Sequence, residues 1–115
     1  MICLLNAFSA NMIADFPASV RFTEVSPELA RELLLHSAVQ INAAEYRIRS
    51  AVGHEETAAV FSSVLGLTVE CRRETITLKS GDTAVVGQYS GIRLPIGATQ
   101  LPEGSQIRWL TVEVQ

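Results

Sequence analysis

Apolar residues recur along this chain in two different spacings, one typical of β-strands and the other typical of α-helices. Short apolar or alternating runs predict strands over residues 2–5, 19–25, 67–71, 74–78, 83–89 and 107–114. Apolar residues at helical spacing predict helices over residues 9–16, 26–36 and 55–65. This order predicts an α/β fold in a single domain, residues 1–115, with helices packed on a mixed sheet of five or six strands.

Capping residues mark the ends of the predicted helices. Ser26 is a good N-cap, and Pro27 follows it at the first helical position, where its missing N–H has no cost. Gly66 can adopt the left-handed conformation that ends many helices, so it predicts the end of the helix over 55–65. Ser9 can cap the short helix predicted over 9–16.

Two segments give weaker signals. Within residues 39–49, Val39 and Ile41 alternate as in a strand, whereas the residues from Asn42 onwards favour a helix, and we interpret them as helical. Residues 90–105 are rich in glycine and proline and predict a long loop. Loops of that length in a small domain usually carry function or are disordered.

Composition narrows the classes of function. The chain is 48% hydrophobic and 18% charged, with a net charge of −3, so it lacks the broad basic face that binds duplex DNA. Most of the nine basic residues are arginine, which suits placed, two-pronged phosphate contacts. No apolar run approaches the length of a membrane span, and the first five residues lack the positive charge of a signal peptide. We therefore expect a cytoplasmic protein with neither DNA nor a membrane as partner.

We expect structural roles for the two cysteines, the tryptophan and one of the two histidines. Cys3 and Cys71 lie in apolar runs, and we expect both to be buried free thiols. Trp109 is expected in the core or at a subunit interface. His36 lies at the end of a leucine-rich helix and is assigned no catalysis. The chain has no spacing of cysteine and histidine typical of a metal site.

His54, next to Gly53, is the candidate for chemistry. An imidazole changes charge near neutral pH and can therefore transfer a proton. The helix predicted over 55–65 begins directly after it, and unpaired N–H groups at a helix start favour a bound anion. A proton donor beside an anion site predicts phosphodiester chemistry. The alternative is a structural histidine on an exposed turn.

Three segments together carry a resemblance to a known family. They are residues 5–12, residues 50–58 around Gly53 and His54, and residues 88–95, with Gly-Ala-Thr at 97–99 behind them. In this order they resemble the viral anti-CRISPR ring nucleases and their bacterial counterparts, over nearly the whole chain. The resemblance implies a homodimer that binds cyclic tetra-adenylate, the second messenger of type III CRISPR systems. It implies cleavage, without a metal or other cofactor, to linear di-adenylate ending in a 2′,3′-cyclic phosphate.

The resemblance also implies roles for individual residues. His54 matches the general acid, and Arg93 matches the arginine that stabilises the phosphate. The residues that match substrate-binding positions are Asn6, Ser9, Asn11, Arg73 (on a predicted strand) and Gln88. A ring of four identical nucleotides has rotational symmetry, so a two-fold dimer can present the same residues to two opposite phosphates.

The chain departs from the family pattern at Ile96, where the family usually has a glutamate that supports the histidine. A nearby carboxylate keeps an imidazole protonated as a donor. Its loss predicts slow cleavage unless Glu55, Glu56 or Glu103 substitutes for it. Two alternatives remain, namely a sponge or sensor that binds the ring without cutting it and a scaffold dimer that binds no nucleotide.

Overall fold

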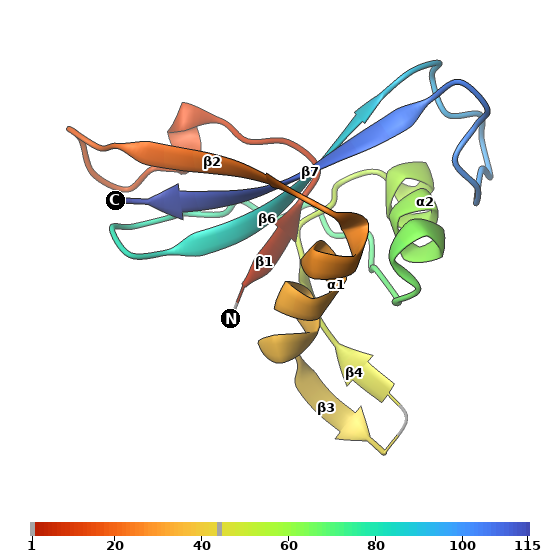
Figure 1. Ribbon diagram of the computed structural model, residues 1–115, viewed down its shortest axis with the longest axis horizontal. Helices are drawn as coiled ribbons and strands as arrows, with labels where there is room; N and C mark the ends of the chain where they lie inside the picture. Colours follow the sequence, from red (N-terminus) through yellow and green to blue (C-terminus); the bar gives the residue numbers. More distant parts are fainter. Residues whose placement is uncertain (1, 44) are drawn as a thin grey trace.

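The computed structural model describes residues 2–43 and 45–115 and is built on a five-stranded mixed sheet (Figure 1). The strands, in sheet order, are β2 (Val20–Val25), β7 (Gln106–Val114), β6 (Thr83–Ser90), β1 (Cys3–Leu5) and β5 (Arg49–Ser50). β7 runs antiparallel to β2 and β6, whereas β1 runs parallel to β5 and β6. The α/β class and the mixed sheet are confirmed, and the predicted β1, β2, β6 and β7 agree with the structure to within about one residue.

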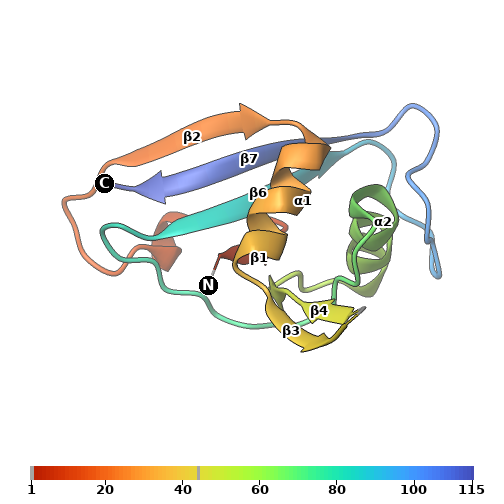
Figure 2. The same ribbon diagram turned by 60° about the horizontal axis from the view of Figure 1, so that its bottom comes forward.

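Two helices, α1 (Pro27–His36) and α2 (Glu55–Leu65), pack on one face of the sheet (Figures 1 and 2). Their predicted ends are confirmed. The Ser26 Oγ accepts a hydrogen bond from the Leu29 N–H at 3.1 Å, and Gly66 ends α2 in the left-handed conformation at φ 66°. Within the described part of the chain, no helix has both the length and the apolar character needed to cross a membrane.

Each face of the sheet has its own hydrophobic core, because successive strand residues point to opposite sides. Leu4, Val85 and Trp109 face the helices and pack with Phe61 of α2. Trp109 is only 2% exposed, so its predicted place in the core is confirmed. The other face is covered by irregular chain and by η1 (Ala10–Met12), a 3-10 turn. Its core consists of Cys3, Leu5, Ile13, Ile76, Leu78, Ala84, Val86, Val112 and Val114.

The helical interpretation from Asn42 is wrong. The chain instead forms an antiparallel pair, β3 (Val39–Asn42) and β4 (Glu45–Arg47), with one irregularity in its register. This hairpin projects from the sheet below α1 in Figure 1. The Asn42 Nδ2 donates to the Glu45 Oε2 at 3.1 Å across the turn, so local polar contacts favour the hairpin over a helix. Residue 44 lies outside the described residues.

The two strands predicted over 67–71 and 74–78 are also wrong. Each segment forms one isolated β-bridge in place of a strand ladder, Val52 with Cys71 and Ile13 with Leu78. Apolar residues do alternate in the second segment, since Ile76 and Leu78 are both buried. They are buried because the segment lies against a face of the sheet, not because it is a strand within it. Arg73 therefore lies in irregular chain instead of a strand.

The helix predicted over 9–16 is shorter in the structure. It is reduced to η1, in which the Ser9 Oγ accepts from the Asn11 N–H at 3.2 Å. Ser9 is thus the N-cap that the sequence predicts.

Candidate functional site

The parallel strands β1, β5 and β6 point toward the same end of the sheet, and β6 continues to Ser90 beyond the last residue of β1. The register pairs Leu4 with Ser50 and Leu5 with Val86. The chain then continues into Asn6 after β1 and into the turn at Gly53 after β5. In open α/β sheets, ligands bind at the carboxyl ends of parallel strands. The topology therefore brings two of the three resemblance segments to an edge suited to ligand binding.

The backbone of Gly53 connects two candidate residues at this edge. The Gly53 N–H donates to the Asn6 Oδ1 at 3.4 Å. The Arg73 Nε donates to the Gly53 carbonyl oxygen at 3.1 Å. Asn6 and Arg73 lie 67 positions apart in the sequence numbering yet contact the same residue, immediately before His54.

His54 is the N-cap residue of α2 and is exposed, in an extended conformation at φ −127° and ψ 132°. Its carbonyl oxygen accepts from the Ala58 N–H at 2.9 Å, which starts the helix, but its side chain makes no capping bond. Within residues 2–43 and 45–115, the imidazole has no hydrogen-bond or ion-pair partner. It is therefore available to a ligand.

His54 and Arg93 line the same open cavity of about 760 Å³. Arg93 lies in the loop over residues 91–105, which runs beside α2 in Figure 2. The Tyr89 hydroxyl anchors this loop by donating to the Ile92 carbonyl oxygen and by accepting from the Ser105 hydroxyl at 3.0 Å. Among the described residues, the Arg93 guanidinium has no partner. The cavity thus holds one cation and one proton-transfer group, both uncommitted.

Gly91 is required where this loop leaves β6. Its φ is 147°, a conformation that residues with a side chain rarely adopt, and a Cβ there would collide with the Ser105 side chain. The loop can therefore turn back against α2 only with glycine at this position.

A second cavity, of about 400 Å³, lies on another side of His54 and is lined by Arg73 and Cys71. His54 and Glu56 line both cavities, so the two arginine-bearing cavities adjoin at these residues. Cys71 is exposed, which corrects the expectation that both thiols are buried. Its segment makes only the one bridge to Val52, so its side chain is not enclosed by a sheet.

Three glutamates were candidates to replace the family glutamate that is absent at Ile96, and they differ in their positions relative to His54. Ile96 is 98% exposed and lines the cavity that contains His54 and Arg93. Glu56 lines both His54 cavities, Glu55 lines only the one with Arg73, and Glu103 lines neither. Of these three carboxylates, Glu56 is therefore the one that shares both cavities with His54.

Three candidates are not brought into these cavities. Ser9 and Asn11 hydrogen-bond to each other in η1, and Gln88 is exposed on β6 opposite Arg108 of β7. None of the three lines a cavity with His54. Tyr89 does line the Arg93 cavity, although the sequence analysis gave it no role. Its place inside the third resemblance segment was the available signal.

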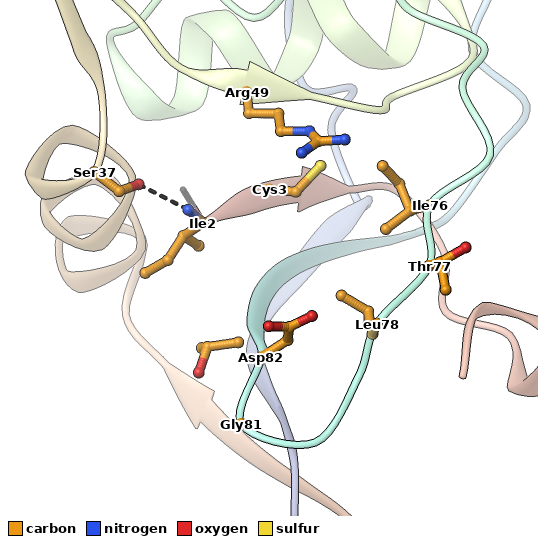
Figure 3. A pocket seen from close by; sticks show the side chains of 10 residues that line it. Ile2, Cys3, Ser37, Arg49, Ile76, Thr77, Leu78, Gly81 and Asp82 are labelled. Atoms are coloured by element: carbon orange, nitrogen blue, oxygen red, sulfur yellow. Dashed lines mark hydrogen bonds between the residues drawn. The ribbon is translucent and has the colours of Figure 1, made fainter. Parts of the chain in front are cut away.

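Another cavity, of about 350 Å³, lies beside Cys3 (Figure 3). Its charged groups already have partners, since Arg49 pairs with Glu74 at 3.0 Å and the Asp82 Oδ2 accepts from the Lys79 N–H at 2.9 Å. Burial raises the pKa of the Cys3 thiol above its ordinary value of 9.0. Among residues 2–43 and 45–115, no group of three or more His, Cys, Asp or Glu is arranged to hold a metal ion.

The structure is that of a small α/β protein with an exposed histidine that lines one cavity with Arg93 and another with Arg73. The sequence profile of the STIV B116-like family matches residues 2–107, and the chain belongs to this family. Among solved structures it is similar to B116 of Sulfolobus turreted icosahedral virus, with a TM-score of 0.75 and 24% identity over 97% of each chain. This likeness shows a shared fold. A comparison with curated protein sequences finds no match.

Proposed function

We propose that this protein binds cyclic tetra-adenylate at the His54 edge of its sheet and cleaves it to linear di-adenylate with a 2′,3′-cyclic phosphate. The observation that carries the proposal is the uncommitted His54 imidazole, in a residue that lines one cavity with Arg93 and another with Arg73. The resemblance of the three sequence segments to ring nucleases supplies the identity of the ligand.

These groups match what the reaction requires. A ribose 2′-oxygen forms a bond to the adjacent phosphorus, its proton passes to solvent, and the bond from phosphorus to the 5′-oxygen breaks. The protonated His54 imidazole donates its proton to the departing 5′-oxygen. The Arg93 guanidinium binds the two non-bridging oxygens, where charge accumulates in the transition state. Glu56 lines both His54 cavities, and in this proposal its carboxylate pairs with the imidazole only once the imidazole is protonated beside bound ligand.

The proposed active form is a homodimer. Two-fold symmetry would present one His54 and one Arg93 to each of two opposite phosphates of the ring, so that two cuts give two di-adenylates. Apolar surface next to the site supports a partner there, because Ile92 is 62% and Ile96 98% exposed. Doubling the arginines also lets a chain of net charge −3 bind a tetra-anion.

The exposed Ile96 favours one second candidate, a protein that binds the ring without cutting it. Its side chain lines the Arg93 cavity and carries no titratable group. Under this alternative, Glu56 does not replace the family glutamate and His54 is a poor proton donor.

The test is to incubate the protein with labelled cyclic tetra-adenylate in EDTA and to measure binding and products separately. We expect binding at micromolar protein and slow formation of di-adenylate with a cyclic phosphate end. Binding without product would establish the second candidate, and absence of binding would leave a scaffold protein. Ile96→Glu should accelerate cleavage if a carboxylate is limiting, and an unchanged rate would show that Glu56 already serves.

A further inference from the structure

We propose that Asn6 and Arg73 are positioning residues that fix the His54 imidazole by holding the backbone of Gly53. This inference rests on the proposed function, in which His54 donates the proton. It differs from the roles that the resemblance implies for these two residues, which are contacts with the substrate.

The two contacts hold successive peptide groups. The Asn6 Oδ1 accepts from the Gly53 N–H, which belongs to the peptide bond between Val52 and Gly53. The Arg73 Nε donates to the Gly53 carbonyl, which belongs to the peptide bond between Gly53 and His54. Between them they restrict the orientation of both peptide planes that lead into His54.

These contacts are the last in two rows of hydrogen bonds along residues 50–53. On the β1 side, the Ala51 N–H donates to the Leu4 carbonyl at 2.9 Å, and Asn6 continues the row. On the opposite side, the Arg72 N–H donates to the Val52 carbonyl at 2.8 Å, and Arg73 continues that row. Both rows change from backbone to side-chain groups at Gly53, immediately before the catalytic residue.

Ser50 anchors the start of the same segment. It is only 2% exposed, its hydroxyl donates to the Glu70 carbonyl at 2.7 Å, and it accepts from the Val52 N–H at 3.2 Å. Residues 50–53 are therefore fixed from a buried start to the Gly53 turn. The same bonds also hold the irregular segment over 70–73 against residues 50–53.

His54 depends on its backbone for position, because no described contact fixes its side chain, and that backbone is held by the Ala58 N–H after it and by the Gly53 contacts before it. The imidazole makes no capping bond to α2 and has no partner among the described residues. Loss of either contact at Gly53 lets the residue before α2 reorient, which displaces the proton donor from the leaving oxygen. Because a small misplacement of a reacting group slows the chemical step more than it weakens binding, the cost falls on the rate.

The experiment compares four variants by the hydrogen exchange of the Gly53 amide, followed by NMR, and by single-turnover cleavage and binding of cyclic tetra-adenylate. Asn6→Ala removes the acceptor, and Asn6→Asp keeps an acceptor oxygen in the same place. Arg73→Lys keeps the positive charge but loses the Nε donor. Arg72→Ala is the matched control, because Arg72 pairs its Nε with Glu70 at 3.1 Å and not with Gly53.

Asn6→Ala should speed exchange of the Gly53 amide about tenfold and slow cleavage by about 10²-fold, with affinity nearly unchanged. Asn6→Asp should restore slow exchange and most of the rate, and Arg73→Lys should slow cleavage despite its retained charge. Arg72→Ala should behave as wild type. Unchanged Gly53 exchange in Asn6→Ala would overturn the proposal, as would a loss of affinity in Asn6→Asp without a change in exchange, since that pattern indicates contact with a phosphate.

The exchange measurement needs no ligand, so it separates this inference from the proposed function. If the wild type neither binds nor cleaves the ring, the proposed function fails and the catalytic part of the inference fails with it. Fast Gly53 exchange in Asn6→Ala would still establish that Asn6 holds the peptide.

Discussion

The cavity that His54 shares with Arg93 and the cavity beside Cys3 are each lined by an arginine and a carboxylate, yet their charged groups are committed differently. Beside Cys3, Arg49 is paired with Glu74 and Asp82 accepts a backbone N–H. Beside His54, the imidazole and the Arg93 guanidinium have no partner in the described part of the chain. A group that is already paired binds a ligand only after it loses its partner. Uncommitted groups, more than the presence of a cavity, therefore distinguish the edge of the sheet at which we propose ligand binding.

Removing the uncommitted histidine should have the largest effect. His54→Ala should lower the single-turnover rate of cyclic tetra-adenylate cleavage on the order of 10²–10⁴-fold, because the leaving oxygen loses its proton donor. Binding should change much less. His36→Ala is the matched control, since His36 is the last residue of α1 and lines no His54 cavity. Equal rates for His54→Ala and wild type would remove the proposed acid.

Arg93→Ala should have the next largest effect. We expect it to weaken binding and to lower the cleavage rate by about 10²–10³-fold, the typical cost of removing one group that stabilises transition-state charge. Arg108→Ala is its control, because Arg108 pairs with Glu24 at 3.2 Å outside both His54 cavities. The measurement is a titration of rate against protein concentration. If the two arginine variants lose the same activity, net charge and not the position of Arg93 accounts for the loss.

A pair of glycine substitutions separates the core from the functional edge. A Cβ at Gly87 would lie 2.6 Å from the Phe61 Cζ and the Trp109 Cζ3, so Gly87→Ala should lower the free energy of unfolding by about 1–3 kcal/mol. At Gly53 a Cβ would lie 3.5 Å from the Arg73 Cγ, an ordinary contact, so Gly53→Ala should change it by less than about 0.5 kcal/mol. Urea denaturation measures both. A larger loss for Gly53→Ala would mean that the turn is more tightly packed than the contacts indicate.

The smallest expected effect is a difference between the alkylation rates of the two cysteines. Cys71 is exposed in the Arg73 cavity, whereas Cys3 is buried with a raised pKa, so at pH 8 alkylation should be about tenfold faster at Cys71. Mass spectrometry of the modified peptides measures this directly. Since the folded pKa of Cys3 exceeds the ordinary 9.0, its contribution to stability is present below pH 9 and is lost as pH rises through the folded value. Equal labelling of both thiols would show that the Cys3 cavity opens readily.

Local signals made much of the fold predictable. Ser26 with Pro27 marked the start of α1, and Gly66 marked the end of α2, because capping depends on one or two residues. The hairpin over 39–47 was not predictable in the same way. Its residues carry both strand and helix signals, and pairing between β3 and β4 decided between them.

The candidate site was predictable in part. His54 and Arg93 line the same cavity, and both lie in segments that carry the family resemblance, residues 50–58 and 88–95. The meeting of Asn6 and Arg73 at Gly53 was not visible, because it requires the parallel pairing of β1 with β5 and an irregular segment beside them. Cys71 is exposed because it lies in that irregular segment. This was not predictable, since the same apolar pattern fits both a strand and irregular chain that lies against a sheet.

The most direct test of the account is an NMR titration of the two histidine rings with cyclic tetra-adenylate. The chain has two histidines, so His36 serves as an internal reference for His54. The account predicts that the ring signals of His54 shift on adding ligand, that those of His36 do not, and that Arg93→Ala greatly reduces the shift at equal ligand concentration. Unchanged His54 signals in the presence of bound ligand would contradict it.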